Sequence, residues 1–169
     1  MVEPEKRFAS LYSDHELYCA GHLIEAGIAL YKTTGNKKLL NAVTRYARLL
    51  CSVFGERGNK SYDGHEEIEL TLIKLYRVTG DESVLSLARH FIDIRGSLPH
   101  PWDKETGLSH SQTPIPEYMF GQSHKPIIEQ TKAEGHAVRA MYLYCAMTDV
   151  ASLTGDKQLQ GIVKSSGRM

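Results

Sequence analysis

The chain has 169 residues, and its 20 lysines and arginines balance 20 aspartates and glutamates, so the formal net charge is zero. That length suits one domain with a sizeable core, and 41% hydrophobic with 24% charged residues is typical of a globular protein. Charge balance argues against nucleic acid and membrane as partners, and the charged start MVEPEKRFAS is unlike a secretion signal, so we expect a cytoplasmic protein.

A helical unit recurs along the chain. Residues 28–35 read IALYKTTG, residues 73–80 read IKLYRVTG, and a weaker third copy ends in SLTGD at 152–156. Apolar residues at helical spacing run up to each Thr-Gly, whose glycine is able to end a helix in the left-handed conformation. An N-cap residue for a second helix follows each glycine directly: Asn36, Asp81 and Asp156. The predicted fold class is therefore all-α, built from repeated helical hairpins.

Capping boxes predict where the first helix of each pair begins. A Ser, Asp or Thr stands three residues before a glutamate at three places, namely Ser13, Asp63 and Thr131. In such a box, the first side chain accepts a hydrogen bond from the backbone of the fourth residue. We therefore expect helices to start beside these three residues.

A long Pro-rich loop is expected between the second and third copies. Residues 96–126 hold five of the six prolines and Trp102, the one tryptophan of the chain. Proline blocks helix interiors, and loops of this length are usually functional or disordered. The aromatic and histidine content favours a packed binding loop. We therefore divide the chain into an N-terminal extension at 1–12, a helical domain at 13–165 and a tail at 166–169.

Histidine recurs near the start of each first helix. Gly-His pairs place His22, His65 and His136 there, and His15 precedes His22 by seven residues on nearly the same helical face. Imidazole near a helix N-terminus tends to stay neutral and offers one donor and one acceptor, which suits a polyhydroxylated ligand. Any one of these histidines is more simply a core or capping residue. The three together make the two interpretations about equal.

Other catalytic and metal motifs are missing. The chain contains no HExxH, GxSxG, Walker or GxGxxG motif. Glu66 as a catalytic acid is a minority interpretation, because the helix dipole favours acids in a first turn in any protein. Cys19, Cys51 and Cys145 form no CxxC pair and lie in apolar helical stretches. We therefore expect three buried thiols, no metal site and no cofactor.

Three strings are long enough to be specific: HELYCAGHLIEAGIALYKTTG, GHEEIELTLIKLYRVTGDE and HKPIIEQTKAEGHAVRAMYLYCAMTD. They resemble the catalytic domain of the β-L-arabinofuranosidases of glycoside hydrolase family 127, over roughly residues 8–160. The resemblance implies an (α/α)6 barrel, of which this chain would form about half. It also implies that the histidines of the AGH, GHEEIE and EGHAVRA strings help to hold a terminal L-arabinofuranoside. Our candidate substrate-binding residues are His22, His65, His136, His15, Glu66 and Trp102.

The same resemblance implies chemistry that these residues lack. The family hydrolyses with retention through a cysteine nucleophile bound to zinc, which further cysteines and a glutamate hold, and a second glutamate is the general acid/base. Those groups lie C-terminal to the EGHAVRAMYL string, and no glutamate or cysteine follows Cys145 here. We therefore expect a fragment of a glycoside hydrolase that is inactive alone and self-associates through exposed barrel edges. The alternative is a helical-repeat binding module for a protein or carbohydrate partner, without catalysis.

Overall fold

The computed structural model describes residues 3–107 and 115–166, and its regular elements in those ranges are all helices, without a β-strand. Three helix pairs form its frame: α1 (Glu16–Thr34) with α2 (Lys38–Val53), α3 (Ile68–Thr79) with α4 (Glu82–Ile94), and α7 (Ala137–Thr154) with α8 (Lys157–Ser166). Shorter elements lie before and between them: η1 (Pro4–Lys6), α5 (Trp102–Thr106), α6 (Ile115–Phe120) and η2 (Ile127–Glu129). The predicted hairpins are therefore confirmed.

Each hairpin turns at the predicted glycine. Gly35, Gly80 and Gly155 follow α1, α3 and α7 with φ angles of 72°, 68° and 72°, in the left-handed region. The residue after the glycine then bonds the start of the next helix, as Asp81 Oδ1 does by accepting from the Ser83 backbone N–H at 3.2 Å. Asp156 Oδ1 does the same with the Leu159 backbone N–H at 2.9 Å. These local signals fix the antiparallel geometry of all three pairs.

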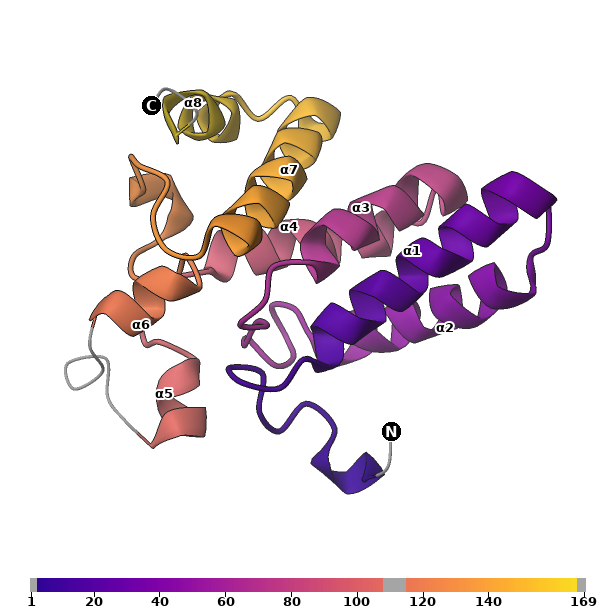
Figure 1. Cartoon of the computed structure of the whole chain (residues 1–169), viewed down its shortest axis with the longest axis horizontal. Helices are drawn as coiled ribbons and strands as arrows, with labels where there is room; N and C mark the ends of the chain where they lie inside the picture. The colour runs from indigo at the N-terminus through magenta and orange to yellow at the C-terminus, as the bar shows by residue number, and fades with distance from the viewer. Residues whose placement is uncertain (1–2, 108–114, 167–169) are drawn as a thin grey trace.

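The first helices of the pairs form one layer in the order α1, α3, α7 (Figure 1), and α2 and α4 form a second layer against it. Helix α8 packs on α7 and is seen end-on beside it. The core lies between the layers, and the apolar stripes of α2 and α4 supply much of it: Leu40, Val43, Ala47, Leu50, Val84, Leu87, Ala88, Phe91 and Ile92. Burial of these stripes is the main force that holds the layers together.

The helix starts differ from the capping-box prediction. Helices α1, α3 and α7 begin at Glu16, Ile68 and Ala137, later than the boxes indicate. Asp63 caps a different helix from the expected one: its Oδ2 accepts from the backbone N–H of Leu17 in the first turn of α1, at 3.1 Å. A cap that comes from a distant part of the chain leaves no local pattern, so the sequence boxes pointed to the wrong residues.

The segments predicted as an extension and a loop are packed against the helices. Leu11 is buried in the core, so residues before α1 contribute to it. The Pro-rich segment contains α5 and α6, and its stretch at 108–114 lies outside the described residues. Buried Arg95 holds this segment, since its guanidinium donates to the Gly121 carbonyl at 3.0 Å and the Asp63 carbonyl at 2.9 Å.

The end helices of the first layer each keep an exposed stripe. On α1 the stripe contains Cys19 with Leu23, which is 50% exposed, and on α7 it contains Cys145 with Met141, which is 53% exposed. We call these two stripes the edge stripes, and their thiols the edge cysteines. The prediction of three buried thiols is therefore wrong, because only Cys51 is partly covered. Among the helices described, none is long and apolar enough to cross a membrane.

Candidate functional site

The N-terminal ends of α1, α3 and α7 meet beside the Pro-rich segment (Figure 1). Residues from these segments line an open cavity. Its volume is about 380 Å³, within the range of small-ligand sites. The lining residues come from all of these elements: Tyr12, Ser13, His15, His65, Trp102, Glu117, Phe120, Gly121 and Arg139. Aromatic faces and hydrogen-bonding groups thus border one space.

The rings of His15 and His65 are in contact in this site, tilted by 42° relative to each other. Their ring centroids are 3.8 Å apart, with His15 at the N-cap of α1 and His65 just before α3. The His65 backbone N–H donates to Asp63 Oδ1 at 2.7 Å. Because Asp63 also caps α1 through its other oxygen, this buried carboxylate fixes the two histidine-bearing segments relative to each other.

Arg139 joins α7 to this pair. Its guanidinium lies 2.6 Å from His65 Nε2, donates to the Gly64 carbonyl at 2.8 Å and covers the Phe120 ring at 4.6 Å from the centroid. An arginine only donates, so His65 accepts at Nε2 and carries its proton on Nδ1, which faces Asp63 Oδ1 at 3.6 Å. Burial lowers the pKa of Arg139, and nearby acids such as Glu66 oppose that shift.

His22 lies one step further along α1. The Tyr18 ring bridges the two histidines, with its centroid 5.6 Å from that of His65 and 4.5 Å from that of His22. On the far side of His22, the Tyr142 ring of α7 lies 6.4 Å away. The result is a continuous row of rings that runs from the cavity along the open face of the first layer.

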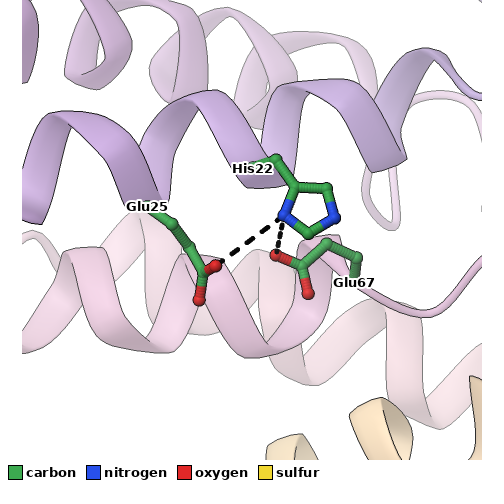
Figure 2. A group of neighbouring side chains, drawn as sticks. All are labelled: His22, Glu25 and Glu67. Carbon is green, nitrogen blue, oxygen red and sulfur yellow. Dashed lines mark ion pairs between the residues drawn. The ribbon is translucent and has the colours of Figure 1, made fainter. Parts of the chain in front are cut away.

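Two carboxylates face the His22 ring. Figure 2 shows Glu25 from the same helix and Glu67 from the start of α3 on the Nδ1 side, with oxygens 3.8 Å and 3.6 Å from this nitrogen. One possible metal-ligand atom of each of the three residues lies within 4.8 Å of the others. No other group of three histidine, cysteine or acidic residues among the described residues lies this close together. Lys74 forms an ion pair with Glu25, so an ammonium group already lies beside the acids.

His136 occupies the N-cap of α7. Its Nδ1 accepts from the backbone N–H of Arg139 at 3.4 Å, and its ring meets that of Phe120 at 5.0 Å between centroids. Of the three predicted Gly-His histidines, only His65 lines the cavity. The other two are linked to it through intermediates: Tyr18 stands between His22 and His65, and Arg139 stands between His65 and His136. His15 lies directly on His65.

Glu66 lies away from the cavity, whereas Trp102 lines it. The side chain of Glu66 is completely buried, and its Oε1 accepts from the Arg95 guanidinium at 3.2 Å. Burial raises the pKa of Glu66 to about 7 despite the opposing charge of Arg95. Trp102 is 1% exposed and donates from Nε1 to the Tyr62 carbonyl at 2.9 Å. Glu66 is thus a core residue with no exposed atom for a sugar, and Trp102 forms a wall of the cavity.

Sequence reasoning missed Tyr18, Glu67 and Arg139. Tyr18 follows His15 by three residues and precedes His22 by four, so helical spacing alone could have placed it on their face. Arg139 similarly follows His136 by three residues in the EGHAVRA string. Glu67 had no such signal, because its contact with His22 joins two helices.

The chain is similar to known glycoside hydrolases. A family model described as the catalytic domain of GH127 β-L-arabinofuranosidases matches residues 1–165. A non-reducing end β-L-arabinofuranosidase of Bifidobacterium longum subsp. longum is 36% identical in an alignment of 169 positions, which covers 96% of this chain and 25% of that protein.

Two solved structures share the fold. A GH127 β-L-arabinofuranosidase from Geobacillus stearothermophilus T6 superposes with a TM-score of 0.90 at 44% identity, over 97% of this chain and 27% of that one. A second GH127 β-arabinofuranosidase gives a TM-score of 0.80 at 34% identity, over 97% and 24%. The chain spans about a quarter of the length of these relatives, and its helix pairs form part of an (α/α)6 barrel, as predicted. The chain belongs to the glycoside hydrolase family 127 catalytic domain family.

Proposed function

We propose that this chain supplies the sugar-binding wall of a glycoside hydrolase that acts on terminal β-L-arabinofuranosides. The observation that carries the proposal is the meeting of His15, His65 and Arg139 from three separate helix starts at one cavity of about 380 Å³. Two histidines and an arginine with purely structural roles would have no need to gather at one cavity from three helix starts. A polyhydroxylated ring does need several donors and acceptors that face the same space.

The chemistry of the cavity suits a pentose. Donors come from the Arg139 guanidinium, and the exposed His15 ring adds a donor and an acceptor. Tyr12 and Phe120 supply aromatic faces, against which the C–H face of a sugar packs. The rigid base for these groups is the Asp63 carboxylate, which ties the start of α1 to His65. The residues of this wall bind and orient a sugar.

A zinc–cysteine centre does not fit the described residues. The one compact group of possible ligands among them consists of His22, Glu25 and Glu67 and contains no cysteine. The edge cysteines lie on opposite end helices of the first layer. We therefore assign binding and orientation of the sugar to these residues, and no bond-breaking step.

Calorimetric titration of the chain with methyl β-L-arabinofuranoside, and with its α-anomer, tests the proposal. We expect preferential binding of the β-anomer and at least about tenfold weaker binding for His15→Ala and Arg139→Gln, since each removes hydrogen bonds to the ligand. His90→Ala on α4 is the matched control, because His90 lies outside the cavity. Equal affinity for both anomers, or unchanged binding by the cavity variants, would refute the assignment. Release of arabinose that disappears in His136→Ala would show that the chain also cleaves.

A further inference from the structure

Helix α1 lies directly on the side chain of Glu67. A Cβ atom placed on Gly21 would come within 2.7 Å of Glu67 Cγ, closer than such atoms approach in real proteins. Glycine at this position therefore lets the start of α3 press its glutamate against the α1 backbone, beside His22. The Gly-His pair of α1 thus has a packing purpose: the glycine makes room for the carboxylate that faces the histidine.

Glu67 is held in place from several sides. Its side chain is 0% exposed, and Oε1 accepts from the Thr71 hydroxyl at 2.7 Å, one turn further along α3. The backbone N–H of Glu67 donates to the His65 carbonyl at 3.0 Å. Its second oxygen, Oε2, is buried without a hydrogen-bond partner among the described residues. A fixed carboxylate therefore stands beside a half-exposed imidazole, with Oε1 nearest the ring and Oε2 unpartnered.

The His22 ring turns Nδ1 toward this carboxylate. Nδ1 lies 3.6 Å from Glu67 Oε1 and 3.8 Å from Glu25 Oε2 (Figure 2). Two negative groups on the same side favour a proton on Nδ1 and leave Nε2 as the bare nitrogen. Of the two acids, Glu25 is partly exposed and paired with Lys74, so the buried and fixed Glu67 has the stronger hold on the ring.

We propose that Glu67 is a positioning residue that holds His22 with Nδ1 protonated and Nε2 free to accept a hydrogen bond from a sugar hydroxyl. The hydrogen bond from the sugar rests on the proposed function, whereas the effect of Glu67 on the His22 tautomer does not. The relay runs from Thr71 through Glu67 to His22, and Gly21 provides the space. It places an acceptor beside the cavity, at the half-exposed ring of His22 that Tyr18 links to His65.

A divalent cation is the competing occupant of the His22, Glu25 and Glu67 group, since one ligand atom of each lies within 4.8 Å of the others. The geometry favours the proton over the metal. The Lys74 ammonium already pairs with Glu25, and Thr71 occupies the Glu67 oxygen that is nearest to His22. A metal would have to displace both interactions.

The tautomer of His22 in the free protein decides the proposal. The experiment uses histidine labelled with nitrogen-15 and long-range proton correlation at about pH 9, where ordinary histidines are neutral. His22→Gln assigns the signal. We expect the Nδ1–H form in the wild type, a mixture in Glu67→Met, and a return to the Nδ1–H form in Glu67→Gln, whose amide oxygen still accepts. Glu25→Gln is the matched control and should keep the wild-type tautomer.

A second variant guards against misfolding of Glu67→Met. Gly21→Ala keeps His22, Glu67 and Thr71 but forces the glutamate away from the ring, so it should give the same mixture while retaining helical circular dichroism. An Nε2–H tautomer in the wild type, or a change in Glu25→Gln alone, would overturn the proposal. So would removal of the Nδ1 proton signal by stoichiometric zinc, since the group would then be a metal site.

Sugar titration separates this inference from the proposed function. If Glu67 positions an acceptor for the ligand, Glu67→Met should weaken binding of methyl β-L-arabinofuranoside about tenfold, and Glu67→Gln should recover most of that loss. A wild-type protein with the expected tautomer but no affinity for the glycoside would reject the proposed function and leave the positioning role standing. Unchanged affinity in Glu67→Met, with binding intact in the wild type, would reject the role of Glu67 in binding.

Discussion

Replacement of Glu66 by glutamine should change how the stability of the protein depends on pH. The Glu66 carboxyl is fully buried, and burial raises its pKa from the ordinary 4.5 to about 7, although Arg95 opposes the rise. Between these two values the unfolded chain releases the proton while the folded chain keeps it. The free energy of unfolding therefore falls as pH increases through this window.

The size of the effect follows from the shift. One pKa unit corresponds to about 1.4 kcal/mol, so a rise from 4.5 to about 7 lowers the free energy of unfolding by roughly 3 kcal/mol once pH passes 7. Glutamine keeps an oxygen that accepts from Arg95 but has no charge to bury. Glu66→Gln should therefore match the wild type near pH 5 and be up to roughly 3 kcal/mol more stable near pH 8.

Urea unfolding, followed by circular dichroism from about pH 5 to about pH 8, measures this difference. Burial also raises the pKa of Glu69, so both proteins should retain some slope, and the difference between the two curves isolates Glu66. Glu129→Gln is the control, because Glu129 is exposed, and its curve should run parallel to that of the wild type. Parallel curves for Glu66→Gln would refute the reasoning, since the buried carboxyl would then titrate alike in the folded and unfolded chain.

Three further outcomes are expected. Gly135→Ala should destabilise the fold by about 3 kcal/mol or more in urea unfolding, because its Cβ would lie 1.8 Å from the Met119 carbonyl oxygen. Gly35→Ala is the control: it has open space around it and should cost only about 1 kcal/mol, from the strain of a left-handed alanine. The edge cysteines should react with a disulfide reagent within seconds in native buffer, and Cys51, whose thiol pKa is raised by burial, should react at least about tenfold more slowly; equal rates would contradict the described burial. The wild type should self-associate through the edge stripes, and the double variant Leu23→Glu, Met141→Glu should be shifted toward monomer in sedimentation velocity without loss of helicity. A monomeric wild type would contradict this association.

The sequence predicted the helix pairs because their signals are local. A glycine that ends a helix and an aspartate that begins the next one act within a few residues, as Gly80 and Asp81 do. Apolar periodicity then identifies the face of each helix that packs inward. These features do not depend on what the rest of the chain does, so the hairpins could be predicted from the residues alone.

The site was only partly predictable, because its contacts join distant segments. The Gly-His pairs indicated histidines at three helix starts, but Arg139 reaches His65 across 74 residues, and Glu67 meets His22 between two helices. The burial of Glu66 could not be predicted from the sequence either. The buried Glu66 is paired with Arg95 at the end of α4, and no sequence pattern near Glu66 indicates that partner.

The two oxygens of Asp63 carry a consequence for how the molecule assembles. One accepts from Leu17 in the first turn of α1, and the other accepts from the backbone N–H of His65. During synthesis, the first hairpin leaves the ribosome before this aspartate does, so the opening turn of α1 has to wait for it. We therefore expect hydrogen exchange at Leu17 to report the arrival of the second hairpin rather than the closure of the first.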